Sequence, residues 1–432
     1  MPRLLFTALF CLAAGLGSAC PAPPPGLTVQ KMYVQPERHR VQAQGMWAVW
    51  YNPAFFSPAE ARTVAARLED TRCVAMDDYG MQWPPNLAAG VRFNVYLHAP
   101  GEKDGFEGFG WENGVGSNDA GSNDSGLPFM TLPRGAHADP ANLDHEGFHV
   151  FQWAATSPGY ANGGDSGWFT EASADWFMSE RTPDGADNYI AASAIAASPH
   201  LAMWHGFYNA EPQDPVHWIT GNRQYGMHLF LRYLSVVWGL PDERMTAGFF
   251  DGTTLSPQEY LSQTLGAVQF SQAFADFAAL MTASYVEGPG MPMPDWLLGP
   301  RQRDSGLAER ARIMAETPLA GVENDIALTL RIGAGWASPP PALRPRPWSY
   351  NVVAIDQPSG SAVVQVEANH AAQMLLRLVV RQGDAWVLAP FEPGQVVDLT
   401  HADTAYIVLA WTPPIFGGAA TADYRIRIDP VP

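Results

Sequence analysis

Two histidines and two glutamates stand at spacings that suit the chemistry of a metal-bound water. His145 and His149 are four residues apart, and residues four apart on a helix lie on the same face. Both rings can therefore point at one metal ion, with Glu146 beside them to take a proton from a bound water. A second helix that carries Glu171 would add a third ligand. These residue types predict a hydrolytic zinc centre with one zinc ion per chain.

The residues around both motifs predict the helices that must hold them. Asp139 followed by Pro140 is typical of an N-cap and a first helical position. A second helix is expected after the capping residues 164–167, and Glu171 and Asp175 are four apart on one of its faces. A metal-bound histidine normally donates its other ring N–H to a carboxylate. We therefore expect Asp175 to orient one of the two histidines.

The alternative interpretation is an ordinary amphipathic helix whose two histidines are solvated or packed in the core. Under this alternative, the helix signals, Glu171 and Asp175 would all stand at these positions by coincidence. We therefore favour the metal site over the plain helix.

The two motifs resemble those of the gluzincin branch of zinc metallopeptidases, a group with a thermolysin-like catalytic core. The chain carries HEGFH at 145–149 and EASAD at 171–175. The residues around these motifs resemble poorly characterised secreted or lipoprotein members of that branch more closely still. The resemblance spans about residues 40–290, although only the two helices carry specific motifs.

This resemblance implies His145, His149 and Glu171 as zinc ligands and Glu146 as the general base of a peptidase. Two features of related groups are missing from the sequence. No third histidine follows at the short spacing of the metzincins, and no glycine-rich exopeptidase signature precedes the first motif. The choice between endopeptidase and exopeptidase therefore stays open.

Gluzincins usually place a tyrosine or histidine from a later helix near the zinc, where it donates a hydrogen bond to the developing oxyanion. The helix expected over residues 222–238 carries Tyr225 and His228 about one turn apart. Both are candidates for this catalytic role. The alternative is that Tyr225 packs against its neighbours and His228 lies in the core.

Composition narrows the classes of partner. The chain has 25 Lys and Arg residues against 43 Asp and Glu residues, a formal net charge of −18. Nucleic acids and anionic membrane surfaces are recognised by clustered Lys and Arg, so we expect neither as a partner. The expected partner is a peptide or protein substrate. Nothing in the sequence predicts the oligomeric state.

The N-terminus is typical of an export signal. Residues 1–19 combine a positive start with an apolar run over 4–16 that is too short to span a bilayer. A proline-rich tether over 20–30 follows. We therefore expect an exported protein, either a cell-envelope lipoprotein of the outer membrane or surface, or a secreted one.

Cys20, directly after the signal segment, distinguishes these two routes. Small residues precede it and the tether follows, which favours lipidation of Cys20 and a membrane contact through that anchor alone. An ordinary signal peptide would instead leave Cys20 free to form a disulfide with Cys73 in an oxidising compartment.

The pattern of helices and strands predicts an α+β domain over residues 31–320, and the resemblance to gluzincins implies that this domain is catalytic and has a thermolysin-like core. The expected elements are strands at 46–51, 91–98 and 128–132, a helix from Ser57 to about Asp70, the two motif helices, and later helices at 187–197, 222–238, 256–265 and 271–285. An Asn- and Asp-rich repeat at 116–126 could chelate Ca²⁺, but its spacing does not match an EF-hand, so we favour a turn-rich loop.

Short alternating runs separated by turn residues fill the C-terminal part of the chain. This pattern of short strands and turns predicts a β-sandwich over 326–432. Such modules bind glycans or partners, or shield a catalytic domain. The main alternative to a peptidase is therefore a surface-anchored binding protein on a metallopeptidase-like fold without turnover, and a zinc hydrolase of non-peptide amides is a third hypothesis.

Overall fold

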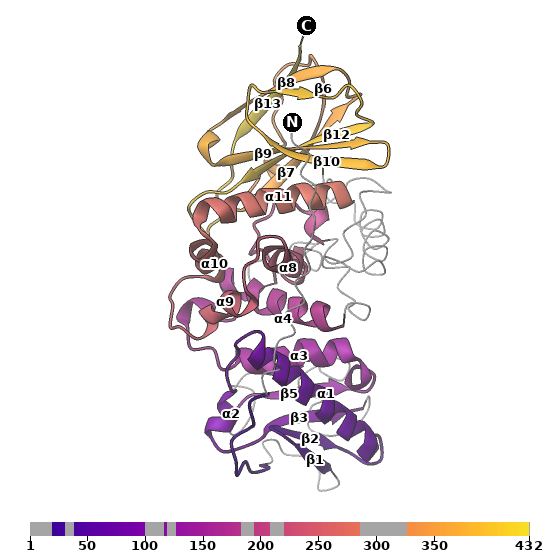
Figure 1. The fold of residues 1–432 in the computed structure, drawn as a ribbon, viewed down its shortest axis with the longest axis vertical. Helices are drawn as coiled ribbons and strands as arrows, with labels where there is room; N and C mark the ends of the chain where they lie inside the picture. The colour runs from indigo at the N-terminus through magenta and orange to yellow at the C-terminus, as the bar shows by residue number, and fades with distance from the viewer. Residues whose placement is uncertain are drawn as a thin grey trace.

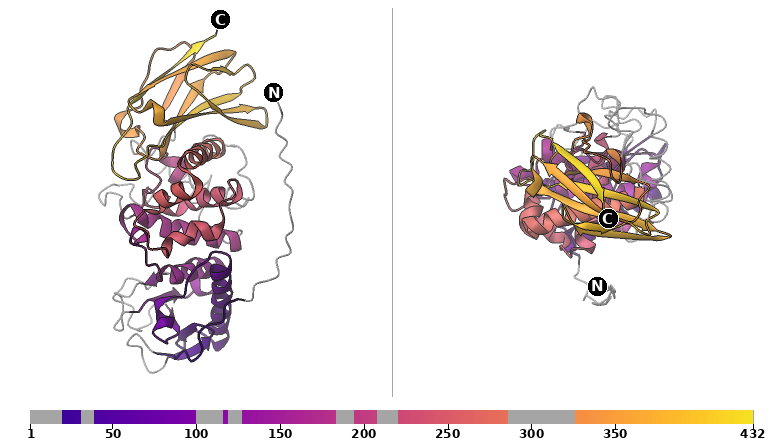
Figure 2. Two further views of the ribbon diagram at one scale, coloured as in Figure 1. Left: turned by 60° about the vertical axis from the view of Figure 1, so that its left-hand side comes forward. Right: turned by 90° about the horizontal axis from the view of Figure 1, so that it is seen from above.

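A computed structural model of the 432-residue chain describes residues 20–30, 39–99, 116–118, 127–182, 194–207, 220–285 and 326–431. Its elements form three layers along the long axis: a sheet with helices, a helical layer and a β-sandwich (Figure 1). A second view shows the same column of layers (Figure 2). The chain is thus a mixed helix and strand protein, in agreement with the α+β prediction. Within the described residues, no helix is both long and apolar enough to cross a membrane.

The N-terminal layer is built on a sheet with the strand order β1-β2-β3-β5-β4. Its members are β1 (Arg40–Gln44), β2 (Trp47–Tyr51), β3 (Phe93–His98), β5 (Phe129–Pro133) and β4 (Gly116–Asn118). The β2–β3 and β3–β5 pairs are parallel, whereas the edge strands pair antiparallel. Strands β2, β3 and β5 fall on the three predicted strands, and β1 adds an edge strand that no sequence pattern indicated.

The asparagine- and aspartate-rich repeat begins with strand β4. Residues 119–126 of that repeat lie outside the described residues, so calcium binding there stays a prediction. The signal segment, residues 1–19, lies outside them as well.

Helix α1 (Pro58–Asp77) packs on β1, β2 and the first motif helix. Ser57 and Glu60 form the capping box that starts it, with the Glu60 carboxylate accepting the Ser57 N–H at 2.6 Å. The helix runs past its predicted end near Asp70. Thr71 and Arg72 prolong its buried face because each finds hydrogen-bond partners inside the protein.

Next in the chain come the two motif helices, α3 (Pro140–Gln152) and α4 (Gly167–Arg181). The other helices with defined bounds are α2 (Pro85–Ala88) in the N-terminal layer, then α7 (Arg223–Gly226), α8 (His228–Val236), α9 (Asp242–Thr246), α10 (Pro257–Leu265) and α11 (Ala267–Tyr285). The single helix predicted over 222–238 is therefore two helices with a break at Met227. Most of the helix predicted over 187–197 lies outside the described residues. Residues 194–197 of that range are described, and they are helical.

The C-terminal layer consists of two sheets that share one apolar core. One sheet has the order β10 (Ala385–Phe391), β9 (Met374–Gln382), β12 (Thr404–Trp411), β7 (Ser349–Asp356) and β6 (Leu328–Arg331). The other has the order β11 (Val396–Asp398), β8 (Ser361–Ala368) and β13 (Tyr424–Pro430). Side chains from both sheets meet between them, as a β-sandwich requires.

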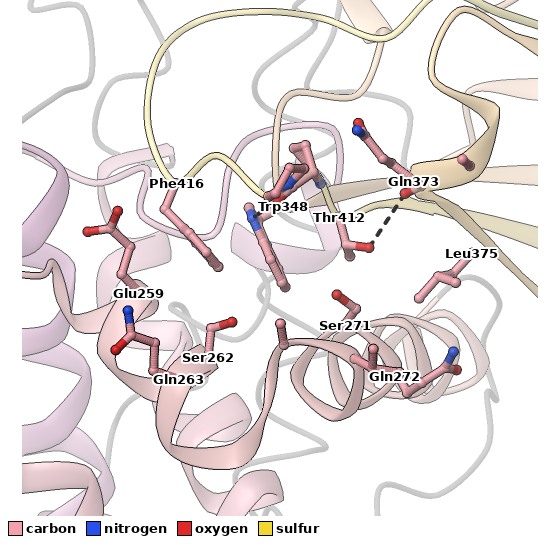
Figure 3. A pocket seen from close by; sticks show the side chains of 15 residues that line it. Glu259, Ser262, Gln263, Ser271, Gln272, Trp348, Gln373, Leu375, Thr412 and Phe416 are labelled. Carbon is pink, nitrogen blue, oxygen red and sulfur yellow. Dashed lines mark hydrogen bonds between the residues drawn. The ribbon is translucent and has the colours of Figure 1, made fainter.

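Helix α11 joins the sandwich to the helical layer. Phe270 and Phe274 of α11 pack against Trp348, with ring centroids 5.0 and 5.8 Å away. On the other side of the same interface, Arg377 of β9 binds Asp276 of α11 at 2.5 Å. A cavity of about 530 Å³ opens between the start of α11 and the sandwich loops, walled by Trp348 (Figure 3). The sandwich is thus packed onto the helices rather than tethered to them.

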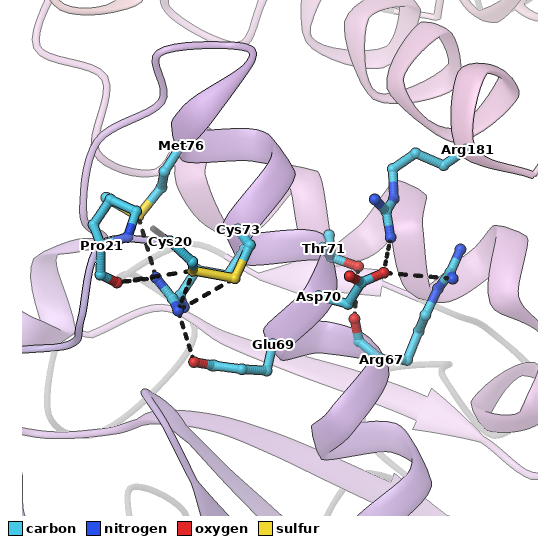
Figure 4. Close-up of a disulfide and its surroundings, with 10 residues drawn as sticks. Cys20, Pro21, Arg67, Glu69, Asp70, Thr71, Cys73, Met76 and Arg181 are labelled. Carbon is cyan, nitrogen blue, oxygen red and sulfur yellow. Dashed lines mark hydrogen bonds and ion pairs between the residues drawn. A yellow bond between two sulfur atoms is a disulfide. The ribbon is translucent and has the colours of Figure 1, made fainter. Parts of the chain in front are cut away.

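Cys20 forms a disulfide with Cys73 of α1 (Figure 4). The buried Arg72 donates to the Pro21 carbonyl and contacts Cys20 Sγ at 2.6 Å, which fixes the start of the tether against the helix. A sulfur held in this disulfide cannot carry a thioether-linked lipid. The structure therefore shows the disulfide alternative at Cys20, and the expected lipidation of Cys20 is incompatible with it.

Candidate metal centre

Helix α3, which carries the first motif, lies between the sheet of the N-terminal layer and helix α4 (Figure 1). Asp139 caps it by accepting the Ala141 N–H at 2.9 Å, and Pro140 takes the first position as predicted. Gly147 lets α3 approach α1 closely, because a Cβ atom at this position would lie 2.9 Å from Thr71 Cγ2. The glycine inside the motif is therefore explained by packing.

The structure brings the three predicted ligands together. His145 Nε2 and His149 Nε2 are 3.0 Å apart, and Glu171 Oε2 lies 3.5 Å from the first and 3.3 Å from the second. Ligands about 2.0–2.2 Å from a zinc ion at tetrahedral angles are about 3.3–3.6 Å apart. The donor set thus fits one small ion with little movement. Among the described residues, this is the group of His, Cys, Asp and Glu side chains able to hold a metal ion.

Both histidines have their second ring nitrogen held by a partner. Asp175 Oδ1 lies 2.6 Å from His145 Nδ1, as the spacing on α4 predicted. Gln152 Oε1 lies 2.6 Å from His149 Nδ1, and its amide group donates to the Thr170 carbonyl at 3.0 Å. In the neutral rings each Nδ1–H donates to its acceptor oxygen, so the Nε2 atoms carry the lone pairs that face the cluster.

The charges around the cluster suit a cation. Burial alone would raise the pKa of the Glu171 carboxyl, but the charges and hydrogen bonds of His149 and His145 hold it well below its usual range. Burial likewise opposes the charged form of His145, yet the Asp175 carboxylate raises the pKa of that ring well above its ordinary value. The Glu146 carboxylate also lies close enough to raise the pKa of both rings. A metal ion held here would take the place of the protons that these groups attract.

The ligands keep a path to solvent. The side chains of His145, His149 and Glu171 are 10–14% exposed, so an ion held by them can still meet a water or a substrate group. Glu146 is 8% exposed and belongs to the same turn of α3. Three protein ligands with an accessible face are typical of catalytic rather than structural zinc sites.

Tyr225 and His228 occupy different environments. The Tyr225 ring lies 6.2 Å from the His145 ring, between centroids. Burial raises the pKa of the Tyr225 phenol, and Glu171 and Asp175 raise it further, so the hydroxyl keeps its proton. His228 is fully buried, with Nδ1 3.0 Å from the Tyr225 carbonyl. His228 is thus packed in the core in this structure, as the alternative expected, and a catalytic role for it stays a prediction.

Asp144 organises the helices around the site, although the sequence motifs gave it no role. Its carboxylate is fully buried and accepts hydrogen bonds from Thr71 at 2.7 Å, Thr182 at 3.0 Å and Arg181 at 3.1 Å, and also from Arg67. These partners come from α1 and from the end of α4. Asp144 therefore fixes α3 between its neighbours directly beside the first ligand.

Comparisons of the sequence with protein-family models and with curated proteins found no match.

Proposed function

We propose that this protein is an exported, zinc-dependent metallopeptidase of the gluzincin type. The observation that carries the proposal is the convergence of His145, His149 and Glu171 within hydrogen-bonding range of one another. Two imidazoles and one carboxylate, with an acidic residue beside them, are the donor set of hydrolytic zinc sites. The oriented Nδ1 atoms support the same proposal, because catalytic zinc ligands are usually fixed in this way.

Each residue of the site has a separate role in the proposed peptide hydrolysis. His145, His149 and Glu171 would hold a zinc ion, which would supply Lewis acidity and activate a water at neutral pH. Glu146 takes the proton of the attacking water and returns it to the leaving amine. Tyr225 donates its phenolic proton in a hydrogen bond to the carbonyl oxygen as negative charge develops there.

Two independent features support the proposal that the protein is exported. The N-terminal segment has the composition of a signal peptide. The Cys20–Cys73 disulfide is a bond that forms and persists in oxidising compartments outside the cytosol. We therefore place the protein in the cell envelope or the medium.

The first test is metal content followed by hydrolysis. We expect about one zinc per chain by mass spectrometry of the purified protein, and loss of that zinc in His149→Ala and Glu171→Ala. The variant Glu146→Gln should keep the metal and lose cleavage of a complex peptide mixture, because it removes the base and leaves the ligands. Glu392→Gln, an exposed change in the sandwich, is the control that should keep both.

Two results would contradict the proposal. A wild-type protein that binds no metal after reconstitution with zinc lacks the centre. A zinc-loaded protein that cleaves no peptide, and whose partner binding is the same with Glu146→Gln, is the surface binding protein of the alternative hypothesis.

A further inference from the structure

Arg223, in the short helix α7, is a buried cation with no carboxylate partner among the residues that the structure describes. It is 2% exposed, and its guanidinium donates to the carbonyls of Ser198 at 2.7 Å, Leu201 at 2.9 Å and Ile195 at 3.2 Å. A longer contact of 3.5 Å reaches the Ala202 carbonyl. Burial lowers the pKa of Arg223 to about 10, which leaves it charged at neutral pH.

A buried charge is costly unless its hydrogen bonds are satisfied, so its neighbourhood must be well ordered. Within the described part of the chain, every hydrogen-bond acceptor of Arg223 is a carbonyl or hydroxyl oxygen of residues 195–202. The guanidinium therefore binds this segment as a folded unit, because it needs several carbonyls to converge at once.

The same segment is fixed on its other side by the β-sandwich. Three backbone hydrogen bonds cross between them: Met203 N–H to the Trp348 carbonyl at 2.9 Å, and the Arg346 and Tyr350 N–H groups to the carbonyls of His200 at 3.0 Å and Pro199 at 2.9 Å. Trp348 is itself anchored to α11 and stacks on Phe416, 4.6 Å away (Figure 3). Residues 194–207 thus form a bridge between the sandwich and α7.

Tyr225 lies at the far end of this bridge. Its neighbour Gln224 accepts the Phe207 N–H at 3.0 Å, so two successive residues before Tyr225 are bound to the bridge. Gly206 makes this approach possible, because a Cβ atom there would lie 2.4 Å from Gln224 Oε1. The break at Met227 leaves α7 a single short helix, whose position depends on these contacts more than on its own length.

We infer that Arg223 is a positioning residue, through which the β-sandwich holds Tyr225 at the metal centre. The sandwich is then part of the catalytic unit rather than a separate binding module. The effect on catalysis rests on the proposed peptidase function, whereas the coupling between the sandwich and α7 does not.

The inference is tested with Arg223→Met, which keeps the length of the side chain and removes its charge and donors. Metal content should stay unchanged, because the ligands lie on α3 and α4. Hydrogen exchange of the α7 amides should become at least about tenfold faster. The kcat for peptide cleavage should fall about tenfold with little change in KM, because Tyr225 acts on the transition state.

A double-mutant cycle separates positioning of Tyr225 from general damage. In a Tyr225→Phe background, Arg223→Met should lower kcat by less than about threefold, since the group that it positions is gone. Arg377→Met is the matched control: Arg377 is also buried at the sandwich interface, but it binds Asp276 and Gln272 of α11. That variant should leave α7 exchange and kcat unchanged. An equal loss in both backgrounds, or α7 exchange unaffected by Arg223→Met, would overturn the inference.

A measurement on the wild-type protein decides the coupling even where Arg223→Met does not fold or no peptide is cleaved. Native-state hydrogen exchange in increasing denaturant should show amides of α7, of residues 199–203 and of 348–351 opening together as one cooperative unit. Opening of α7 well before the other two would refute the bridge. Absence of cleavage by the zinc-loaded wild type would count against the peptidase proposal only.

Discussion

Gln152 Oε1 lies 2.6 Å from Nδ1 of His149, three residues earlier on the same helix. The two histidines of the candidate metal centre are therefore oriented by different groups, since His145 is held by the Asp175 carboxylate. The amide of Gln152 is itself fixed by the Thr170 carbonyl and the Ser173 hydroxyl of the α4 helix. One side chain thus sets the tautomer of a ligand and joins the two motif helices.

We predict that Gln152→Ala lowers zinc affinity by about 10- to 100-fold, the usual cost of losing an orienting partner. Affinity is measured by competition with a chelator of known strength. Gln258→Ala is the control, because Gln258 is an equally buried amide that binds Trp168 and the Asp165 carbonyl instead. It should lower the melting temperature and leave zinc affinity unchanged. Equal affinities for wild type and Gln152→Ala would show that His149 needs no such support.

Gly147 gives a prediction about packing under the metal site. In Gly147→Ala, the new methyl would lie 2.9 Å from Thr71 Cγ2 and 3.1 Å from Leu68 Cδ2, so α1 and α3 must move apart. We expect a loss of about 1–3 kcal/mol in the free energy of unfolding, measured with urea. Thr71→Ser removes the clashing methyl and keeps the hydroxyl that binds Asp144. The double variant should therefore recover much of the loss, and failure to recover would place the strain elsewhere.

The parts of this fold that could be predicted depend on patterns within a single helix or strand. The four-residue spacing of His145 and His149, the Asp139 cap and the four-residue step from Glu171 to Asp175 all act within one helix, and the structure has each of them. The sandwich was predictable for the same reason, since strand alternation and turn residues are local. The prediction of a single helix over 222–238 was wrong in its middle, where the chain breaks at Met227 between α7 and α8.

Residues whose role depends on distant partners were not predictable. Asp144 is one residue before a ligand, but its partners come from α1 and the end of α4. Arg223 is two residues before Tyr225, and its acceptors lie more than twenty positions away. Polar residues inside helices are ordinary in a sequence, so only the packing shows that these two are buried. Cys20 was ambiguous because lipidation and a disulfide use the same sulfur.

The chemical state of Cys20, lipidated or disulfide-bonded, can be tested directly. We expect the mature protein to show no acyl mass and no free thiol until it is reduced. Cys73→Ser opens a loop that spans 53 positions, and the chain-entropy model predicts a loss of about 4 kcal/mol in the free energy of unfolding. The measurement combines intact mass before and after reduction with urea denaturation. A lipid-modified Cys20 in protein from the native host would contradict the disulfide and restore the anchored form.

His200 makes the junction between the sandwich and the helices sensitive to acid. Burial lowers the pKa of its ring, and the nearby charges of Arg223 and Arg346 add to this effect and bring the pKa to about 3. An unfolded chain protonates histidine near pH 6.5, so the unfolded state binds more protons than the native state between about pH 6.5 and 3. The free energy of unfolding should therefore decrease as the pH is lowered through this window. Above about pH 6.5, His200 should have no effect on it.

The magnitude of this loss is on the order of 4 kcal/mol at the acid end, since each pKa unit corresponds to about 1.4 kcal/mol. His200→Gln removes the titrating ring and should flatten the urea-derived stability curve between pH 6.5 and 4. His401→Gln, an exposed change in the sandwich, should leave the curve as in the wild type. Because the His200 carbonyl accepts the Arg346 N–H, acid should also speed hydrogen exchange of residues 200–203 and 348–351 in the wild type before the other strands of the sandwich open. The same slope in His200→Gln would assign the acid sensitivity to other groups.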